Sequence, residues 1–120
     1  MYWEIPIMKR NIVNARPIYN HSKGHLIAYK VAKHYQVPFE VFMSRKRGKG
    51  IVFPRQVAMW MIKRFDWSED VSLERVGFVF KRNHATVIHG IKQVDNIMSC
   101  YFRERQEINE LLTELKTQIV

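Results

Sequence analysis

The chain has 120 residues, of which 47% are hydrophobic, and its formal net charge is +9. Its length and apolar content predict one domain with a single packed core. The one cysteine excludes a disulfide framework, and no apolar stretch has the length of a membrane span or the form of a signal peptide. We therefore expect a cytoplasmic protein whose partners are polyanions: DNA, RNA or an anionic membrane surface.

The positive charge is concentrated in one part of the chain. Residues 22–66 carry ten basic and two acidic side chains, a net charge of +8. Residues 67–120 carry seven basic and eight acidic side chains, a net charge of −1. This asymmetry favours a localised polyanion-binding face over a uniformly charged surface.

The first half of the chain is expected to contain an N-terminal arm and three helices. Residues 1–21 are irregular, and they form the arm. Apolar residues on one face predict a helix over 25–36, and a short helix follows over 38–43 with proline at its first position. Residues 44–50, with four cations and two glycines, predict a mobile basic loop. Pro54 is expected to open the next helix, which ends near Phe65.

The second half of the chain is also expected to be helical. Ser72 is a candidate N-cap for a helix that ends at Phe80, and Gly77 within it is typical of a close helix approach. Residues 81–83 predict a tight turn, and Asn83 is a candidate N-cap for a last helix from His84. The apolar stripe of that helix continues to the end of the chain, with a possible bend near residues 99–100. The expected fold is an all-α multi-helix bundle, with a main domain over 22–98 and an amphipathic helix over 99–120.

The helix over 72–80, the turn and the following helix match a helix-turn-helix. In such a unit the second helix lies in the major groove and presents its first residues to base edges. The residues at this position are Arg82, Asn83, His84, Ala85 and Thr86. Arginine donates to guanine or phosphate, asparagine can bond adenine through two hydrogen bonds, and the methyl groups of alanine and threonine contact thymine. For Asn83, helix capping and base reading are equally good interpretations.

Several further motifs stand in a fixed order along the chain. They are Ser44-Arg45-Lys46-Arg47, Pro54-Arg55-Gln56, Ser72-Leu73-Glu74-Arg75-Val76-Gly77 and Arg82-Asn83-His84-Ala85-Thr86-Val87-Ile88-His89. Over roughly residues 26–94 the chain resembles the DNA-binding domain of the bacterial replication initiator DnaA, whose fold is Trp-repressor-like. The order and spacing of these motifs make the resemblance far more specific than a helix-turn-helix alone.

The resemblance implies a binding mode on double-stranded DNA. The helix from His84 would enter the major groove, and the basic loop would place Arg47 in the adjacent minor groove, where a narrow A·T tract attracts arginine. The loop also contributes Arg45, Lys46 and Lys49, while Arg55, Gln56 and Lys63 match positions that face the phosphate backbone. The implied target is a short asymmetric site such as a DnaA box, used to regulate replication or transcription at the nucleoid.

Three positions depart from the family pattern. Asn83 replaces an aspartate, Ala85 replaces a threonine, and Glu74 replaces a proline. Aspartate accepts a hydrogen bond from cytosine, whereas asparagine prefers adenine. We therefore expect a preferred site that differs from the standard box at one or two base pairs.

The sequence contains no motif for catalysis or nucleotide binding. A Gly-x-x-x-x-Gly-Lys-Ser/Thr loop is absent from the chain, as is any cluster with metal-ligand spacing. We therefore expect a standalone relative of the DNA-binding domain that is not an enzyme and that uses neither a cofactor nor a metal.

The apolar stripe near the C-terminus leaves a second class of function open. Its members are Ile108, Leu111, Leu112, Leu115 and Ile119. The stripe could fold back onto the domain, form a homodimer or bind a partner protein, in which case the chain would be an adaptor with auxiliary DNA binding. Outside this stripe, Trp60 and Cys100 are expected in the core, and His89 is expected to pack or to bond to the backbone.

Overall fold

The computed structural model describes residues 23–65 and 72–119, and these form six helices without a strand. The helices are α1 (Lys23–His34), α2 (Phe39–Phe42), α3 (Lys49–Arg64), α4 (Leu73–Phe80), α5 (His84–Cys100) and α6 (Phe102–Ile119). The all-α prediction is therefore confirmed, while the expected arm over 1–21 lies outside the described residues. No helix in the described ranges is long and apolar enough to cross a membrane.

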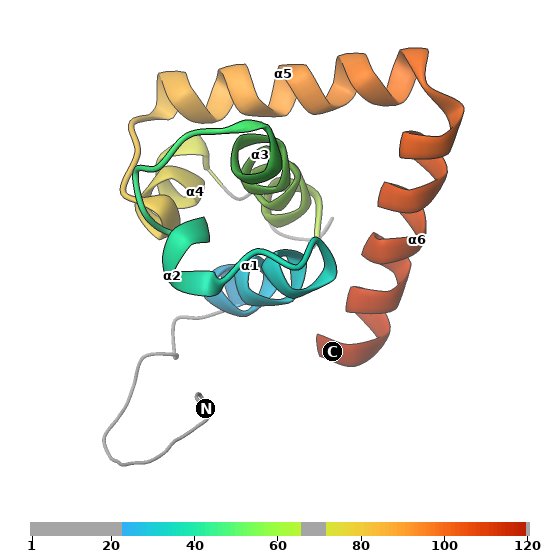
Figure 1. The fold of residues 1–120 in the computed structure, drawn as a ribbon, viewed down its shortest axis with the longest axis horizontal. Coiled ribbons are helices and arrows are strands. Elements are labelled where there is room, and N and C mark those ends of the chain that lie inside the picture. Colours follow the sequence, from blue (N-terminus) through green and yellow to red (C-terminus); the bar gives the residue numbers. More distant parts are fainter. Residues whose placement is uncertain (1–22, 66–71, 120) are drawn as a thin grey trace.

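Helix α3 is the centre of the fold, with the other helices arranged around it (Figure 1). It packs on α1, α2, α4 and α5, and an unbroken run of its residues from 57 to 62 is buried. A helix that is apolar on most sides needs neighbours on most sides. The other helices supply one buried stripe each, for example Ile27, Ala28, Val31 and Ala32 on α1 and Val87, Ile91 and Val94 on α5.

Helix α3 begins at Lys49, so the prediction that Pro54 opens it was wrong. The helix starts after Gly48, whose φ of 148° is a conformation that suits glycine. The carbonyl oxygen of Gly48 accepts hydrogen bonds from the backbone N–H groups of Ile51 and Val52. Pro54 is buried one turn later, where its missing N–H removes a single bond near the helix start. The basic loop is therefore limited to residues 44–48.

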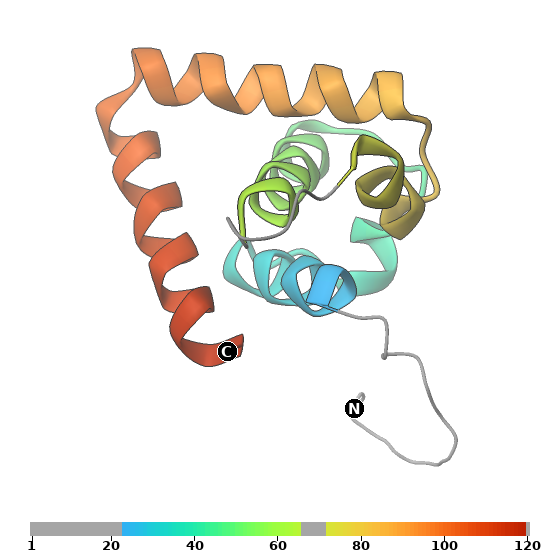
Figure 2. The ribbon, with the colours of Figure 1, turned by 180° about the vertical axis from the view of Figure 1, so that it is seen from behind.

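Helices α5 and α6 meet at a sharp corner, and α6 folds back along the domain (Figures 1 and 2). The chain leaves helical geometry at Tyr101, which has φ −123° and ψ 111°. Helix α6 packs on α5 and α1, and it buries Ile108, Leu111, Leu112 and Leu115. Of the three arrangements considered for the apolar stripe, folding back is the one that the structure shows.

The prediction that Cys100 lies in the core was wrong, and His89 is not packed in the core either. His89 is exposed on α5, and Cys100 is exposed at the end of that helix. The inward positions of α5 are taken by Val87, Gly90, Ile91 and Val94. Both exposures follow from the helical period, because the stripe of α5 that faces α3 is narrow.

Candidate nucleic-acid interface

Helices α4 and α5 are joined by a three-residue turn with a defined backbone geometry. Ser72 caps α4, its hydroxyl accepting a hydrogen bond from the N–H of Arg75 at 3.1 Å. Lys81 adopts the left-handed conformation with φ 56°, and the N–H of Arg82 then donates to the carbonyl of Gly77 at 2.9 Å. The chain thus reverses direction in a few residues, as a helix-turn-helix requires.

Gly77 is required by this turn. A Cβ at this position would lie 2.3 Å from the carbonyl oxygen of Arg82 and 3.4 Å from Cγ2 of Val87. No side chain tolerates the first of these contacts without movement of the backbone. The close approach expected of this glycine is therefore confirmed: its nearest neighbour is the turn, and Val87 of α5 lies next to it.

The first turn of α5 presents its side chains to solvent. Asn83 is the N-cap, and its Oδ1 accepts hydrogen bonds from the backbone N–H of Thr86 at 3.0 Å and from the hydroxyl of Thr86 at 3.2 Å. The capping interpretation of Asn83 is confirmed by this geometry. His84, Ala85 and Thr86 are all exposed. This end of α5 is the positive end of the helix dipole, which attracts anions.

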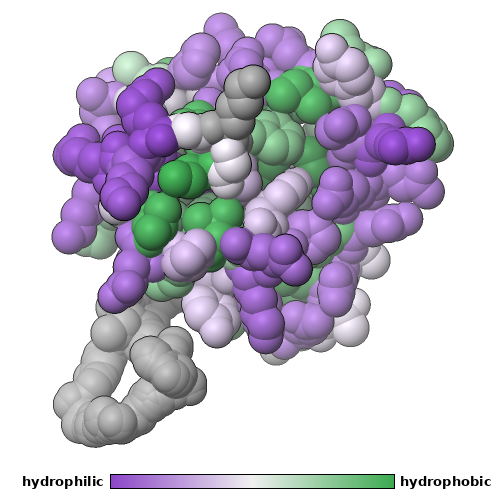
Figure 3. Space-filling model, viewed as in Figure 1, coloured by the Kyte–Doolittle hydropathy of each residue, from purple (hydrophilic) through white to green (hydrophobic). Residues whose placement is uncertain are grey.

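The basic loop, residues 44–48, lies beside this turn. Arg45, Lys46 and Arg47 are exposed, and the guanidinium of Arg82 donates to the carbonyl oxygen of Ser44 at 2.9 Å. This bond joins segments 38 residues apart in the sequence. The loop and the start of α5 thus form one face of the molecule, at the end of α5 away from α6 (Figure 1). In the same view, strongly hydrophilic side chains gather on that side (Figure 3).

Arg55 has a different place from the one expected of it. It was expected to contact phosphate, but its relative exposure is only 6%. Its Nε donates to the carbonyl of Phe42 at 2.9 Å, and one terminal nitrogen donates to Lys46 at 3.1 Å and Val41 at 3.4 Å. Arg55 therefore supports the basic loop from inside, because its donors satisfy carbonyls at the end of α2 and in the loop.

Four arginines share the space around this loop. Burial lowers the pKa of Arg55, and the nearby charges of Arg82 and Arg47 lower it further. Burial also lowers the pKa of Arg82, with Arg45 and Arg47 adding to the effect. The hydrogen bonds of both guanidiniums go to backbone carbonyls. The cluster is therefore a local concentration of positive charge, which attracts anions.

The remaining predicted residues lie on α3. Gln56 is half-buried, and a Cβ at Gly90 would lie 3.2 Å from its Cγ, so α5 passes close above it. Lys63 is half-buried at the far end of α3 from the loop. Lys49 is the first residue of α3.

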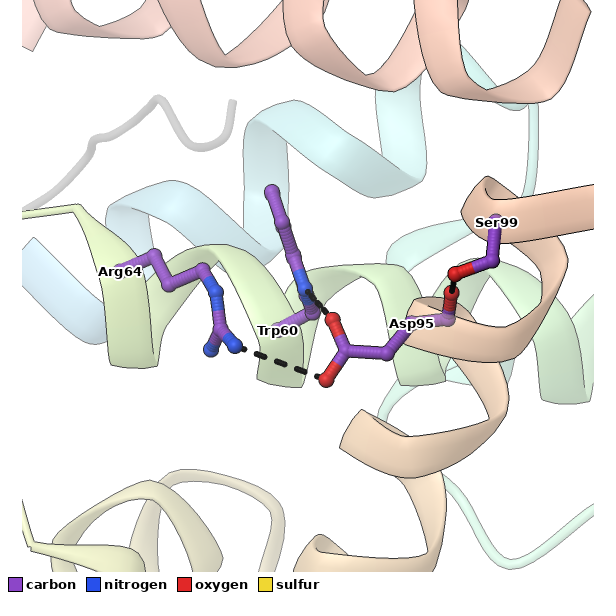
Figure 4. A network of polar contacts seen from close by, with 4 residues as sticks. All are labelled: Trp60, Arg64, Asp95 and Ser99. Atoms are coloured by element: carbon purple, nitrogen blue, oxygen red, sulfur yellow. Dashed lines mark hydrogen bonds and ion pairs between the residues drawn. The ribbon is translucent and has the colours of Figure 1, made fainter. Parts of the chain in front are cut away.

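A polar network that the sequence did not predict fixes α5 on α3 (Figure 4). The indole nitrogen of Trp60 donates to Asp95 at 2.8 Å, and the Arg64 guanidinium reaches the other carboxylate oxygen at 3.5 Å. Arg64 also lies 5.1 Å from the centroid of the Trp60 ring. Trp60 is 5% exposed, which confirms its predicted place in the core. Its burial is compatible with a polar N–H only because Asp95 accepts the bond.

The comparisons with known proteins agree with this geometry. The family model described as "Bacterial dnaA protein helix-turn-helix" matches residues 25–94. Among curated relatives, the chromosomal replication initiator protein DnaA of Thermoanaerobacter sp. (strain X514) is 35% identical over 94 residues, which is 78% of this chain and 20% of that protein. The DnaA of Oenococcus oeni is 32% identical over 115 residues, covering 88% of this chain and 25% of that protein.

A solved structure described as a DNA replication initiation factor superposes with a TM-score of 0.72 at 29% identity. The alignment covers 82% of this chain and 29% of that one. The chain thus spans about a fifth to a quarter of the length of the curated relatives it matches. The matched residues include the basic loop, α4, the turn and α5 as far as Val94. The chain belongs to the bacterial DnaA helix-turn-helix family, a family of DNA-binding domains.

Proposed function

We propose that this protein binds double-stranded DNA sequence-specifically at a short asymmetric site like a DnaA box. At that site it regulates replication initiation or transcription. The start of α5 enters the major groove, and the basic loop enters the adjacent minor groove. The observation that carries this proposal is the hydrogen bond from Arg82 to Ser44, because it holds the two groove-reading segments on one face.

Electrostatics supports the same face as the DNA contact. Burial lowers the pKa of Arg55 and Arg82, and repulsion within the cluster of Arg45, Arg47, Arg55 and Arg82 lowers it further. A DNA phosphate near the cluster adds a negative charge there, and its neutralisation releases counterions from the DNA. DNA binding therefore relieves a repulsion that is present in the free protein.

Individual residues take separate roles in this arrangement. Arg47 reaches into the minor groove, with Arg45 and Lys46 beside it. His84, Ala85 and Thr86 face the base edges from the first turn of α5. In addition, Lys49, Gln56, Lys63 and Arg82 serve as phosphate contacts. Arg55 is not included, because its guanidinium is buried against backbone carbonyls.

The adaptor hypothesis receives no support from α6. Its apolar stripe is covered by α1 and α5, so it does not need a partner protein or a second copy for burial. Phe102 is exposed at the start of α6, and beyond it the outer face is polar, with Gln106, Asn109 and Thr113 exposed.

Selection of random duplex DNA with the purified protein tests this function. Wild-type protein should select one asymmetric motif, and Arg47→Ala and His84→Ala should each lose part of it. Arg103→Ala removes the same charge from an exposed position on α6, so it is the matched control and should select the wild-type motif. Sequence-blind binding by the wild-type protein would refute the proposal.

The salt dependence of binding gives an independent measurement. Each phosphate contact contributes a slope of about −0.9 in log K against log salt concentration. Lys46→Ala should therefore make the slope shallower by about 0.9, the value of one phosphate contact, while Arg103→Ala should leave the slope unchanged. Equal slopes for Lys46→Ala and wild type would contradict the proposal that the basic loop contacts DNA.

A further inference from the structure

Asn83 has one side-chain acceptor, and that acceptor is already in use. Both bonds to Oδ1 come from Thr86, at 3.0 Å from its N–H and 3.2 Å from its hydroxyl. The identity of this atom follows from chemistry, since a backbone N–H requires an oxygen and not the amide nitrogen. Asn83 is exposed, and no group of the described residues accepts a hydrogen bond from its Nδ2.

This arrangement restricts what Asn83 can read. The two-bond contact with adenine requires Oδ1 to accept from N6 while Nδ2 donates to N7. Since Oδ1 is held by the helix start, only the two donors of Nδ2 face outward. The adenine preference expected from the residue type therefore does not apply to this geometry.

We infer that Asn83 determines specificity by donating from Nδ2 to an acceptor edge in the major groove, with guanine preferred and cytosine rejected. Guanine presents two acceptors, O6 and N7, whereas cytosine presents only the N4 donor. Thymine and adenine each present one acceptor and rank between them. This inference rests on the proposed function, because it requires the start of α5 to lie in the groove.

Three substitutions separate the cap from the base contact. Asn83→Asp keeps an oxygen for the cap and turns the outward atom from a donor into an acceptor. Asn83→Ser keeps the capping oxygen and has no second polar atom. Asn83→Ala removes both. Serine and aspartate cap helices about as well as asparagine, so these two variants should keep the wild-type urea midpoint.

The experiment begins with the motif selected by the wild-type protein, which tests the proposed function by itself. Each position of that motif is then replaced by all four base pairs, and relative affinities are measured for wild type, Asn83→Ser and Asn83→Asp. Relative affinity is the correct quantity, because the new charge of Asn83→Asp weakens binding to every site through repulsion from phosphate.

At one position we expect wild type to prefer guanine over cytosine by roughly 3- to 10-fold, the value of a single hydrogen bond. Asn83→Ser should level that preference, and Asn83→Asp should shift it toward cytosine. The inference is overturned if Asn83→Ser keeps every wild-type preference, or if Asn83→Asp selects the same base as wild type. A wild-type preference for adenine that Asn83→Ser abolishes also overturns it, because Oδ1 would then have left the cap.

Discussion

The same substitution, glycine to alanine, is expected to have opposite effects at Gly77 and Gly50. Both residues lie in helices, where alanine is favoured over glycine by up to about 1 kcal/mol. At Gly50 an added Cβ meets no atom within 4 Å, so this preference acts alone. At Gly77 the Cβ would lie 2.3 Å from the carbonyl oxygen of Arg82, which is backbone and cannot rotate away.

The magnitude at Gly77 combines three contributions. Overpacking costs about 3 kcal/mol when backbone has to move, and loss of the hydrogen bond from Arg82 N–H to Gly77 adds about 1 kcal/mol. The helix preference of alanine offsets about 1 kcal/mol of this. Gly77→Ala should therefore lower the free energy of unfolding by about 3 kcal/mol, while Gly50→Ala should raise it by a few tenths of a kcal/mol.

Urea unfolding, followed by circular dichroism at 222 nm, measures both variants directly. The DNA affinity of Gly77→Ala should also fall when it is measured at a temperature where the variant is fully folded, since the turn sets the position of the start of α5. A Gly77→Ala protein as stable as wild type would show that the turn does not need the close approach. In that case the reasoning from the 2.3 Å contact fails.

Three further predictions concern the loop, α6 and a buried phenol. Arg55→Met should weaken DNA binding about as much as Arg47→Ala, and the double variant should lose no more DNA affinity than either single variant. Additive losses of affinity would mean that Arg55 does not act through the loop. Leu115→Ala should lower the free energy of unfolding by about 2–5 kcal/mol in urea, while the exposed Asn109→Ala should change it by under about 0.5 kcal/mol. Burial raises the pKa of Tyr35 above 10.0, and the charges of Glu107 and Glu104 raise it further. Above pH 10 the unfolded state therefore binds fewer protons than the folded state, and the free energy of unfolding falls as the pH rises. Tyr35→Phe should reduce that fall by up to about 1.4 kcal/mol per pH unit in alkaline titrations, and a pH dependence equal to that of wild type would contradict this prediction.

Features set by short-range interactions were predictable from the sequence. The caps Ser72 and Asn83 bond to N–H groups three residues away, so a local pattern contains all the required information. The buried stripes of α1 and α5 follow in the same way from the helical period. The all-α fold and the membership of the family depend on these local signals.

Features set by distant contacts were not predictable. Arg55 belongs to a strongly basic segment, and nothing nearby indicates that its partners are carbonyls 9 to 14 residues earlier. At the end of α5 the expected bend near residues 99–100 was close to the corner at Tyr101, but the reversal of direction was not predictable, because neither glycine nor proline marks it and the apolar period continues past it. The corner forms because Ile108 and Leu115 become buried against the rest of the domain.

The exposed position of Cys100 has a practical consequence for spectroscopy. It is the only cysteine in the chain and lies at the last residue of α5, whose first residue is His84. At 1.5 Å per residue, the two ends of this helix are separated by about 24 Å. A maleimide dye therefore attaches at a single point, at the end of α5 away from the proposed DNA contact. With an acceptor dye on one end of a short duplex, energy transfer would report which way round the protein sits on its asymmetric site.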